Sequence, residues 1–256
     1  MTTTSTPIKA PVPRPLTADD IKTSISLGIR DFLATPMIDL FFASFFVVTG
    51  LVMAWITYAT GTTFWLVLAV LGFPLVGTLA SIGFYETSRL RARGDSVRFS
   101  VVTRLVWSEK NGQLPWLATI IVVLFLFWFF LGHMIFALFL GLSPMTNVST
   151  SLGVFLTTDG LMMLAFGTAI GGVFALVIFS LSVLGIPMLL DRDVDFITAM
   201  IRSMAAVRDN PVLYLFWGFI IAVVTLGAMI PFFLGLFVAM PVLGHASWHL
   251  YKRVTE

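Results

Sequence analysis

Long apolar stretches alternate with short polar ones along this chain. A helix that crosses the hydrocarbon core of a bilayer needs about 20 predominantly apolar residues. Six stretches meet that length: Met37–Tyr58, Trp65–Thr87, Pro115–Leu140, Leu161–Leu190, Pro211–Ile230 and Pro231–Leu250. The connection between the fifth and sixth stretches is so short that these two must be antiparallel neighbours. The pattern therefore predicts an all-α membrane protein with six transmembrane helices, arranged as three helical hairpins.

The polar segment before each odd-numbered crossing repeats apolar side chains at helical spacing. These positions are Ile21, Ile25, Ile29 and Phe32, then Val97, Val101 and Leu105, then Ile197, Ile201 and Met204. A period near 3.6 with basic residues on the opposite face is typical of a helix that lies in the membrane interface. The alternative is a cytoplasmic cap that packs on the bundle, and the two interpretations are compatible.

The three hairpins share sequence features that indicate an internal repeat. A proline precedes or begins each odd-numbered crossing, at Pro36, Pro115 and Pro211. Proline suits the first turn of a helix, where its missing N–H costs nothing. The predicted unit is a surface helix, a crossing and a kinked crossing.

Prolines and small residues mark the even-numbered crossings. Pro74, Pro187 and Pro241 are expected to kink their helices, because each removes a backbone hydrogen bond. Such interruptions mark substrate sites in transporters, but kinks are common in any membrane bundle. Gly167, Gly171 and Ala175 form a small-residue seam that predicts close helix packing.

The distribution of charge predicts the orientation in the membrane. All 15 Lys and Arg residues fall in four stretches, Lys9–Arg30, Arg89–Lys110, Arg192–Arg208 and Lys252–Arg253. Basic residues near membrane ends stay on the cytoplasmic side. We therefore expect a multi-pass protein of the bacterial inner membrane with both termini in the cytoplasm. The Gly141–Gly160 segment would lie outside.

Composition supports this class of protein and excludes others. Hydrophobic residues make up 58% of the chain and charged residues 11%, whereas a soluble domain is about half apolar and a quarter charged. The net charge of +2 is too small to indicate nucleic acid as a partner. The absence of Cys excludes disulfides, thiolate nucleophiles and Cys-ligated metals. Residues 1–16, rich in Thr and Pro, are expected to form a disordered cytoplasmic tail, and residues 17–256 a single transmembrane domain.

A few polar residues near the inner ends of the crossings could carry chemistry. His245 and His249 stand four apart and share a helix face. Such a pair can hold a metal or one face of a haem, given further ligands. The other members of this polar cluster are Asp39, Tyr85 and Glu86, and Glu86 is the further metal-ligand candidate. The alternative is that the histidines only bond to neighbours or headgroups, and that Glu86 pairs with Arg89.

His133 lies inside the third crossing, toward its outer side. An ionisable group at such depth usually faces protein. It could bind haem or relay protons, or it could be a neutral imidazole bonded to a backbone carbonyl. The chain has no catalytic or metal-binding motif, so we predict neither enzymatic activity nor a cofactor, and haem stays an alternative.

Two segments resemble a known family. They are Phe73–Arg89 (FPLVGTLASIGFYETSR) and Pro241–Arg253 (PVLGHASWHLYKR). With them the chain resembles the bacterial integral-membrane proteins of domain-of-unknown-function family 2189, some of which carry the label cytochrome c oxidase subunit I. A catalytic haem-copper subunit needs more histidines than the three present. The resemblance therefore implies at most an accessory or assembly role near a respiratory complex.

Three hypotheses for the function follow. The first is a non-enzymatic accessory, scaffold or assembly component of a membrane complex, with the lipid bilayer and another membrane protein as partners. The second is a small transporter or channel that uses the kinked helices and the polar cluster. The third is a haem- or metal-binding redox protein.

Overall fold

The computed structural model describes residues 10–60, 80–141 and 152–256. Within these ranges the chain forms helices and no strands, which confirms the all-α prediction. The helices are α1 (Ala18–Ala34), α2 (Pro36–Thr60), a helix over residues 80–93, α4 (Phe99–Ser108), α5 (Leu114–Leu140), α6 (Thr158–Ser182), α7 (Gly185–Asp191), α8 (Phe196–Asp209), α9 (Pro211–Met229) and α10 (Leu236–Thr255). Short 3-10 helices occur at Glu109–Asn111 and Leu152–Leu156.

Four helical segments are long and apolar enough to cross a membrane. They are Pro36–Ile56, Leu114–Leu140, Thr158–Asp191 and Pro211–Met229. They correspond to the first, third, fourth and fifth predicted crossings. The second, Trp65–Thr87, lies largely outside the described residues.

The sixth predicted crossing differs from the expectation. Residues 230–235 form a turn, and α10 begins only at Leu236 and continues to Thr255. Polar residues interrupt the apolar character of α10, and about half of the helix is buried inside the protein. α10 is the central element of the fold and contacts α1, α2, α7 and α9.

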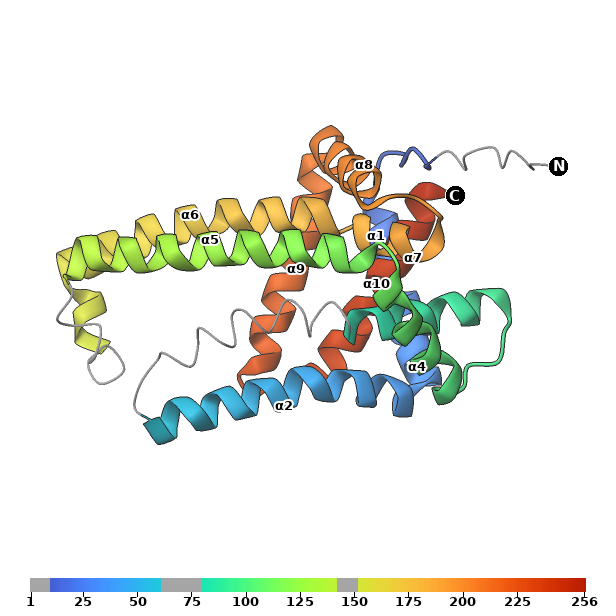
Figure 1. Cartoon of the computed structure of the whole chain (residues 1–256), viewed down its shortest axis with the longest axis horizontal. Helices are drawn as coiled ribbons and strands as arrows, with labels where there is room; N and C mark the ends of the chain where they lie inside the picture. Colours follow the sequence, from blue (N-terminus) through green and yellow to red (C-terminus); the bar gives the residue numbers. More distant parts are fainter. Residues whose placement is uncertain (1–9, 61–79, 142–151) are drawn as a thin grey trace.

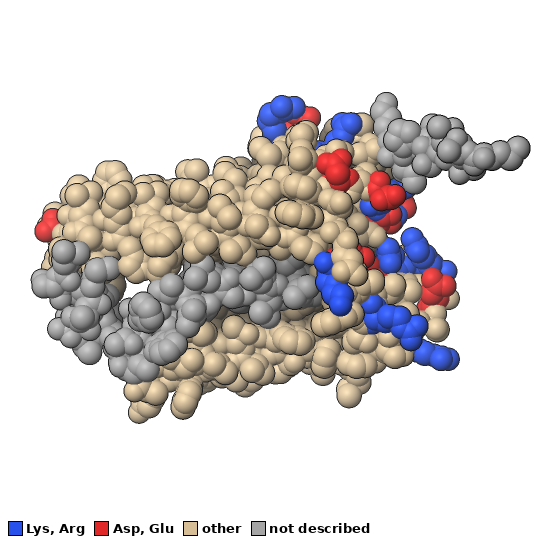
Figure 2. All heavy atoms as spheres, viewed as in Figure 1, with Lys and Arg blue, Asp and Glu red and all other residues tan. Residues whose placement is uncertain are grey.

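The long helices and the short ones occupy different parts of the molecule. In Figure 1, α5 and α6 form an antiparallel hairpin along the long axis, α2 lies on the opposite side, and α9 passes obliquely between them. The short helices α1, α4, α7 and α8 gather at one end. Figure 2 shows Lys and Arg side chains at that same end. We call this end, with the helix at residues 80–93 and the last turns of α10, the charged cap.

Prolines lie at the helix positions that the predicted internal repeat assigns to them. α2 begins at Pro36, and Pro115 and Pro211 lie in the first turns of α5 and α9. Near Pro187 the fourth crossing breaks into α6 and α7, and the Leu184 N–H released by the break donates to Ser203 Oγ over 3.1 Å. α10 continues through Pro241, and Pro74 lies outside the described residues.

The three amphipathic segments lie in or next to α1, α4 and α8, and their predicted faces are buried to different extents. In α1, Ile21 is buried and Ile25 packs against the core, whereas Ile29 is 43% exposed. Val97, Val101 and Leu105 lie against the core around Phe42, Phe84 and Leu90. In α8 the buried residues are Ala199, Ser203, Ala206 and Val207. The predicted face of α8, Ile197, Ile201 and Met204, is 52%, 60% and 48% exposed. α8 therefore packs as part of the cap and also presents an apolar face outward.

Residues 10–16, expected to belong to the disordered tail, lie against the charged cap. Leu16 is 2% exposed. The Arg14 N–H donates to the Val254 carbonyl over 2.8 Å, and Asn210 Nδ2 donates to the Leu16 carbonyl over 2.7 Å. A buried leucine and two bonds to distant elements hold this segment in place. Residues 1–9 are outside the described part of the chain.

Candidate functional site

The candidate site lies where α1, α2, α10 and the helix at residues 80–93 meet. Glycines allow these helices to approach closely. A Cβ on Gly28 of α1 would come within 2.7 Å of the Val242 carbonyl oxygen of α10, and one on Gly244 within 2.6 Å of the Phe84 ring. This close contact brings polar side chains from four helices together.

Asp31 of α1 is the centre of these polar contacts. Ser88 Oγ donates to Asp31 Oδ2 over 2.7 Å, His249 Nε2 lies 2.7 Å from the same oxygen, and Arg91 Nε donates to Oδ1 over 2.9 Å. The side chain of Asp31 is 2% exposed. Burial favours a raised pKa for Asp31, but the hydrogen bonds from His249, Ser88 and Arg91 outweigh it and hold that pKa well below its usual range. Asp31 is therefore an ionised carboxylate inside the protein.

His245 of α10 extends the contacts toward α2. Its Nδ1 lies 2.8 Å from Ser88 Oγ, and its Nε2 lies 3.1 Å from Asp39 Oδ1. The His245 and Asp39 side chains are both fully buried. The Nε2–Asp39 contact is close but is not aligned as a hydrogen bond. Thr35 Oγ1 donates to the second oxygen of Asp39 over 3.0 Å.

Hydrogen-bond geometry assigns the protons of these groups. The single hydroxyl hydrogen of Ser88 goes to the ionised Asp31. His245 Nδ1 must then carry a hydrogen and donate it to Ser88 Oγ. We call Asp31, Asp39, Ser88, Arg91, His245 and His249 together the Asp31 network.

The Asp31 network contains three of the five residues predicted as a polar cluster. Asp39, His245 and His249 belong to it. Tyr85 and Glu86 lie on another side of the helix at residues 80–93: Tyr85 packs 6.3 Å from the Trp248 ring, and Glu86 pairs with Arg89 at 2.8 Å. The Glu86–Arg89 ion pair is the one expected from their spacing.

Three members of the network have no distinguishing sequence signal. Asp31 reads as a helix-end residue, and Ser88 and Arg91 as residues after a crossing. Their importance follows only from tertiary packing. A general signal does exist for Ser88, because it lies within the Phe73–Arg89 segment that carries the family resemblance.

His133 is remote from this network. It lies on the exposed surface of α5, with Nδ1 3.0 Å from the Phe129 carbonyl oxygen one turn earlier. Among residues 10–60, 80–141 and 152–256, no three His, Asp or Glu side chains lie close enough to hold a metal ion. In the described site, Ser88 and Arg91 donate hydrogen bonds to Asp31, so they take up the carboxylate oxygens that a metal ion would need as ligands. The donor set therefore fits a hydrogen-bonded joint between helices.

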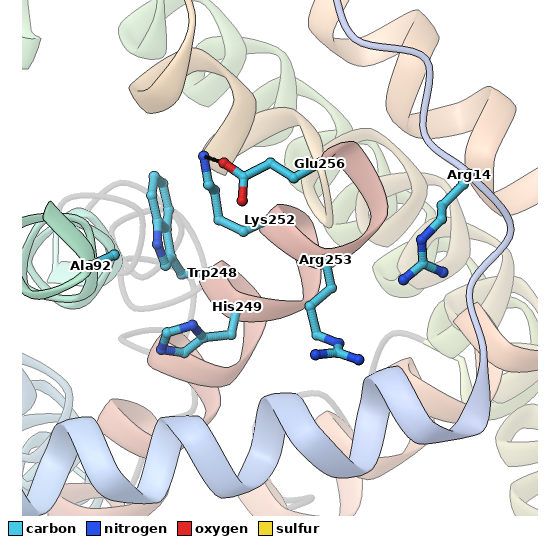
Figure 3. A pocket seen from close by; sticks show the side chains of 7 residues that line it. All are labelled: Arg14, Ala92, Trp248, His249, Lys252, Arg253 and Glu256. Carbon is cyan, nitrogen blue, oxygen red and sulfur yellow. Dashed lines mark ion pairs between the residues drawn. The ribbon is translucent and has the colours of Figure 1, made fainter.

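A cavity of about 440 Å³ adjoins the network at His249. Figure 3 shows Arg14, Trp248, Lys252 and Arg253 around it, with Ala92 and Glu256 completing the lining. Arg14 and Arg253 both bind the buried carboxylate of Asp20. The hydrogen bond from Arg14, helped by those from Thr17 and Arg253, holds the pKa of Asp20 well below its usual range against the effect of burial. We call this cavity the basic pocket.

Comparison with known proteins identifies a family. Residues 66–191 match the model of a family described as a predicted integral membrane protein, DUF2189. The match includes Ser88 and Arg91 but ends before α10, so the Pro241–Arg253 motif lies outside it. Neither a curated protein nor a solved structure matches the chain. The oxidase label of some family members therefore has no support from these comparisons.

Proposed function

Since the chain belongs to the DUF2189 family of predicted integral membrane proteins, we propose that it is a non-enzymatic component of the bacterial inner membrane that assembles with another membrane protein. Its role would be that of an accessory, scaffold or assembly partner. A respiratory complex, implied only by the family resemblance, is one candidate for the whole assembly. The Asp31 network then has a structural role and joins the helices of the charged cap.

The exposure of the α5–α6 hairpin carries the proposal. In the most apolar stretch of α5, only 6% of the residues are buried inside the protein. Large exposed side chains lie along both helices, among them Phe127, Phe130, Leu138, Phe166 and Val173. A helix that is apolar all round needs lipid or other helices on every side. The hairpin therefore has ample surface for a partner beyond the contact between α5 and α6.

Small residues on α6 favour a protein partner at part of this surface. Gly167 and Gly172 have no atom within 4 Å of the position that a Cβ would take, whereas the neighbouring Gly171 packs against Trp128 of α5 at 3.0 Å. Small residues allow the backbones of two helices to approach closely, and lipid gains less from the missing side chains. The predicted seam is thus used by α5 at Gly171 and open at Gly167.

The proposed topology keeps six crossings, grouped as three hairpins, with both termini in the cytoplasm. Its support is the position of the basic residues at one end of the molecule (Figure 2). In this arrangement α10 would complete the third hairpin with α9, with its apolar first half in the membrane and its second half in the charged cap. The loop between α5 and α6 would lie outside.

The other two hypotheses have less support. A carrier needs a polar path through the membrane, but Asp39 lies in the first turn of α2, so the described Asp31 network stays at the cap end. A redox protein needs clustered ligands, yet His133 lies on α5 and the other histidines on α10. An absorption spectrum and a metal analysis of the purified protein test the redox hypothesis independently.

Purification from native membranes tests the proposed function. The tagged full chain is extracted in a mild detergent, and copurifying proteins are identified by mass spectrometry. We expect a membrane protein in stable stoichiometry. The variants Gly167→Leu and Gly172→Leu should lower its recovery several-fold, because the larger side chain blocks close helix contact.

Ala222→Leu is the matched control, since Ala222 is exposed on α9, outside the hairpin. This variant should retain the partner. Recovery of the chain alone from native membranes would contradict an assembly role. A partner yield that is unchanged in both glycine variants would contradict the use of α6 as the contact.

A further inference from the structure

We propose that the basic pocket binds a phosphate-bearing anion at the charged cap. Three permanent cations line the pocket: Arg14 from the N-terminal segment, and Lys252 and Arg253 from the last turns of α10. The hydrogen bond from the Arg14 N–H to the Val254 carbonyl fixes the N-terminal segment beside α10. Cations far apart in the sequence thus converge on one cavity (Figure 3).

Two of the pocket cations share the buried carboxylate of Asp20. Arg14 Nη2 and Arg253 Nε each lie 2.8 Å from Asp20 Oδ1, so two guanidinium groups share one carboxylate. The two cations of this trio outnumber its one carboxylate, and the further carboxylate near it, Asp19, lies 3.8 Å from Arg253 Nη2 and is 78% exposed. The side chain of Asp20 is 1% exposed. It therefore positions the two arginines from behind and does not occupy the pocket.

Several donors around the pocket are weakly engaged. The terminal nitrogens of Arg253 have one ionic contact among the described residues, Nη2 with the exposed Asp19 at 3.8 Å. Lys252 pairs with Glu256, whose side chain is 60% exposed, and lies 3.3 Å from Asp191. A phosphate group can replace Glu256, because it offers more acceptor oxygens to Lys252 and can bind the Arg253 guanidinium through two parallel hydrogen bonds.

Two aromatic side chains add polar groups to the pocket wall. His249 uses Nε2 to bind Asp31, and no described residue bonds to its Nδ1. The indole N–H of Trp248 is buried and has no hydrogen-bond partner in the described part of the chain. Buried polar groups in proteins are almost always bonded. The Trp248 N–H itself has almost no accessible surface, so an anion in the pocket would reach it only after a local rearrangement.

A phosphate group could reach the pocket from two sources, an anionic phospholipid headgroup or a soluble phosphate. Binding experiments on the full chain distinguish them. In one arm, the protein in lipid-free detergent micelles is titrated calorimetrically with inorganic phosphate at constant ionic strength. In the other arm, the protein is placed in nanodiscs of phosphatidylglycerol or phosphatidylcholine and then released, and the retained lipid is identified by native mass spectrometry.

We expect saturable binding of inorganic phosphate, or selective retention of phosphatidylglycerol, and either result supports the site. Arg253→Gln should weaken binding about tenfold, as expected for the loss of one charged hydrogen-bond donor. Since Arg253 also binds Asp20, Lys252→Gln provides a second variant that leaves the Asp20 trio intact, with a loss of similar size.

Arg208→Gln is the control, because it removes one cation of the same cap that is 78% exposed and outside the pocket. It should bind as the unaltered chain does. The absence of saturable binding of both probes overturns the proposal. An equal loss of affinity in Arg208→Gln and Lys252→Gln also overturns it, because it would indicate attraction by the cap as a whole.

Discussion

Ser88 has one hydroxyl hydrogen and two neighbours that could accept it, Asp31 Oδ2 at 2.7 Å and His245 Nδ1 at 2.8 Å. Asp31 takes the hydrogen because Arg91 and His249 keep it ionised. Ser88 in turn accepts from His245. One hydroxyl thus connects the Asp31 contacts of α1 to the His245–Asp39 pair of α10 and α2, with no water needed between them.

Replacement of Ser88 by alanine tests this connection. Ser88→Ala leaves the His245 Nδ1–H without its acceptor in a fully buried place and removes a donor from Asp31. An unsatisfied buried polar group costs about 1–3 kcal/mol, and we expect the free energy of unfolding to fall by that amount. Tryptophan fluorescence during denaturant unfolding in detergent micelles measures the change.

Ser100→Ala is the matched control, because Ser100 is an exposed residue of α4. Its free energy of unfolding should change by no more than about 0.5 kcal/mol. Equal unfolding midpoints for the two variants would mean that the Asp31 network contributes nothing measurable to the stability of the fold.

Part of this network follows from the sequence. The spacing of His245 and His249 places both on one helix face, and Asp39 is unusual because it is a carboxylate at the start of an apolar stretch. Asp31 and Ser88 give no comparable signal. Their contacts join residues 57 positions apart, and no local periodicity specifies which helices will pack at that distance.

At the scale of elements, the contact between α1 and α10 depends on small residues. The buried residues of α1 include Ser24, Gly28 and Asp31, whereas Ile29 is 43% exposed. A Cβ on Gly28 would come within 2.7 Å of the Val242 carbonyl oxygen and 2.8 Å of the Ala246 nitrogen. Both atoms belong to the backbone of α10, so no side-chain rotation can relieve such a clash.

We therefore expect Gly28→Ala to destabilise the protein by about 1–3 kcal/mol, as overpacking of a tight contact does. Thermal unfolding of the purified variant measures the effect.

Gly132→Ala on α5 is a control of opposite sign, because nothing lies within 4 Å of its Cβ position. Alanine is favoured over glycine in a helix by about 1 kcal/mol, so this variant should unfold at the same or a higher temperature. A Gly28→Ala variant as stable as Gly132→Ala would contradict the close contact.

The difference between small buried residues and large exposed ones explains why the packed face of some helices could not be predicted from the sequence. Apolar periodicity identified α1 and α8 as amphipathic helices, but Ile201 of α8 is 60% exposed. In α8 the apolar stripe faces outward, while the side that packs on the protein contains Ala199, Ser203 and Ala206. Small residues have little hydrophobicity, so a search for apolar periodicity does not detect them. The long helices α5 and α9 were predicted nearly to the residue, because lipid exposure requires uninterrupted apolar sequence.

At the scale of the molecule, the charged cap and the apolar helices differ in charge and in how they are stabilised. Buried polar contacts hold the cap together through α10, whereas α5 and α6 extend away from it with few buried residues (Figure 1). Lys and Arg side chains close to a membrane remain on the cytoplasmic side. This rule predicts a cytoplasmic cap, and in that orientation α5 and α6 would cross the membrane and return.

Single-cysteine labelling tests this orientation directly, because the natural chain has no Cys. Ser96→Cys places a thiol in the exposed connection before α4, and Thr158→Cys places one at the exposed start of α6, at the end of the hairpin far from the cap. In cells with a permeabilised outer membrane, a membrane-impermeant maleimide should label Thr158→Cys at once. It should label Ser96→Cys only after the inner membrane is broken. The unaltered chain provides the background. Labelling of Ser96→Cys in cells with an intact inner membrane would put the cap outside, and protection of both thiols would mean that the α5–α6 hairpin does not reach the far side.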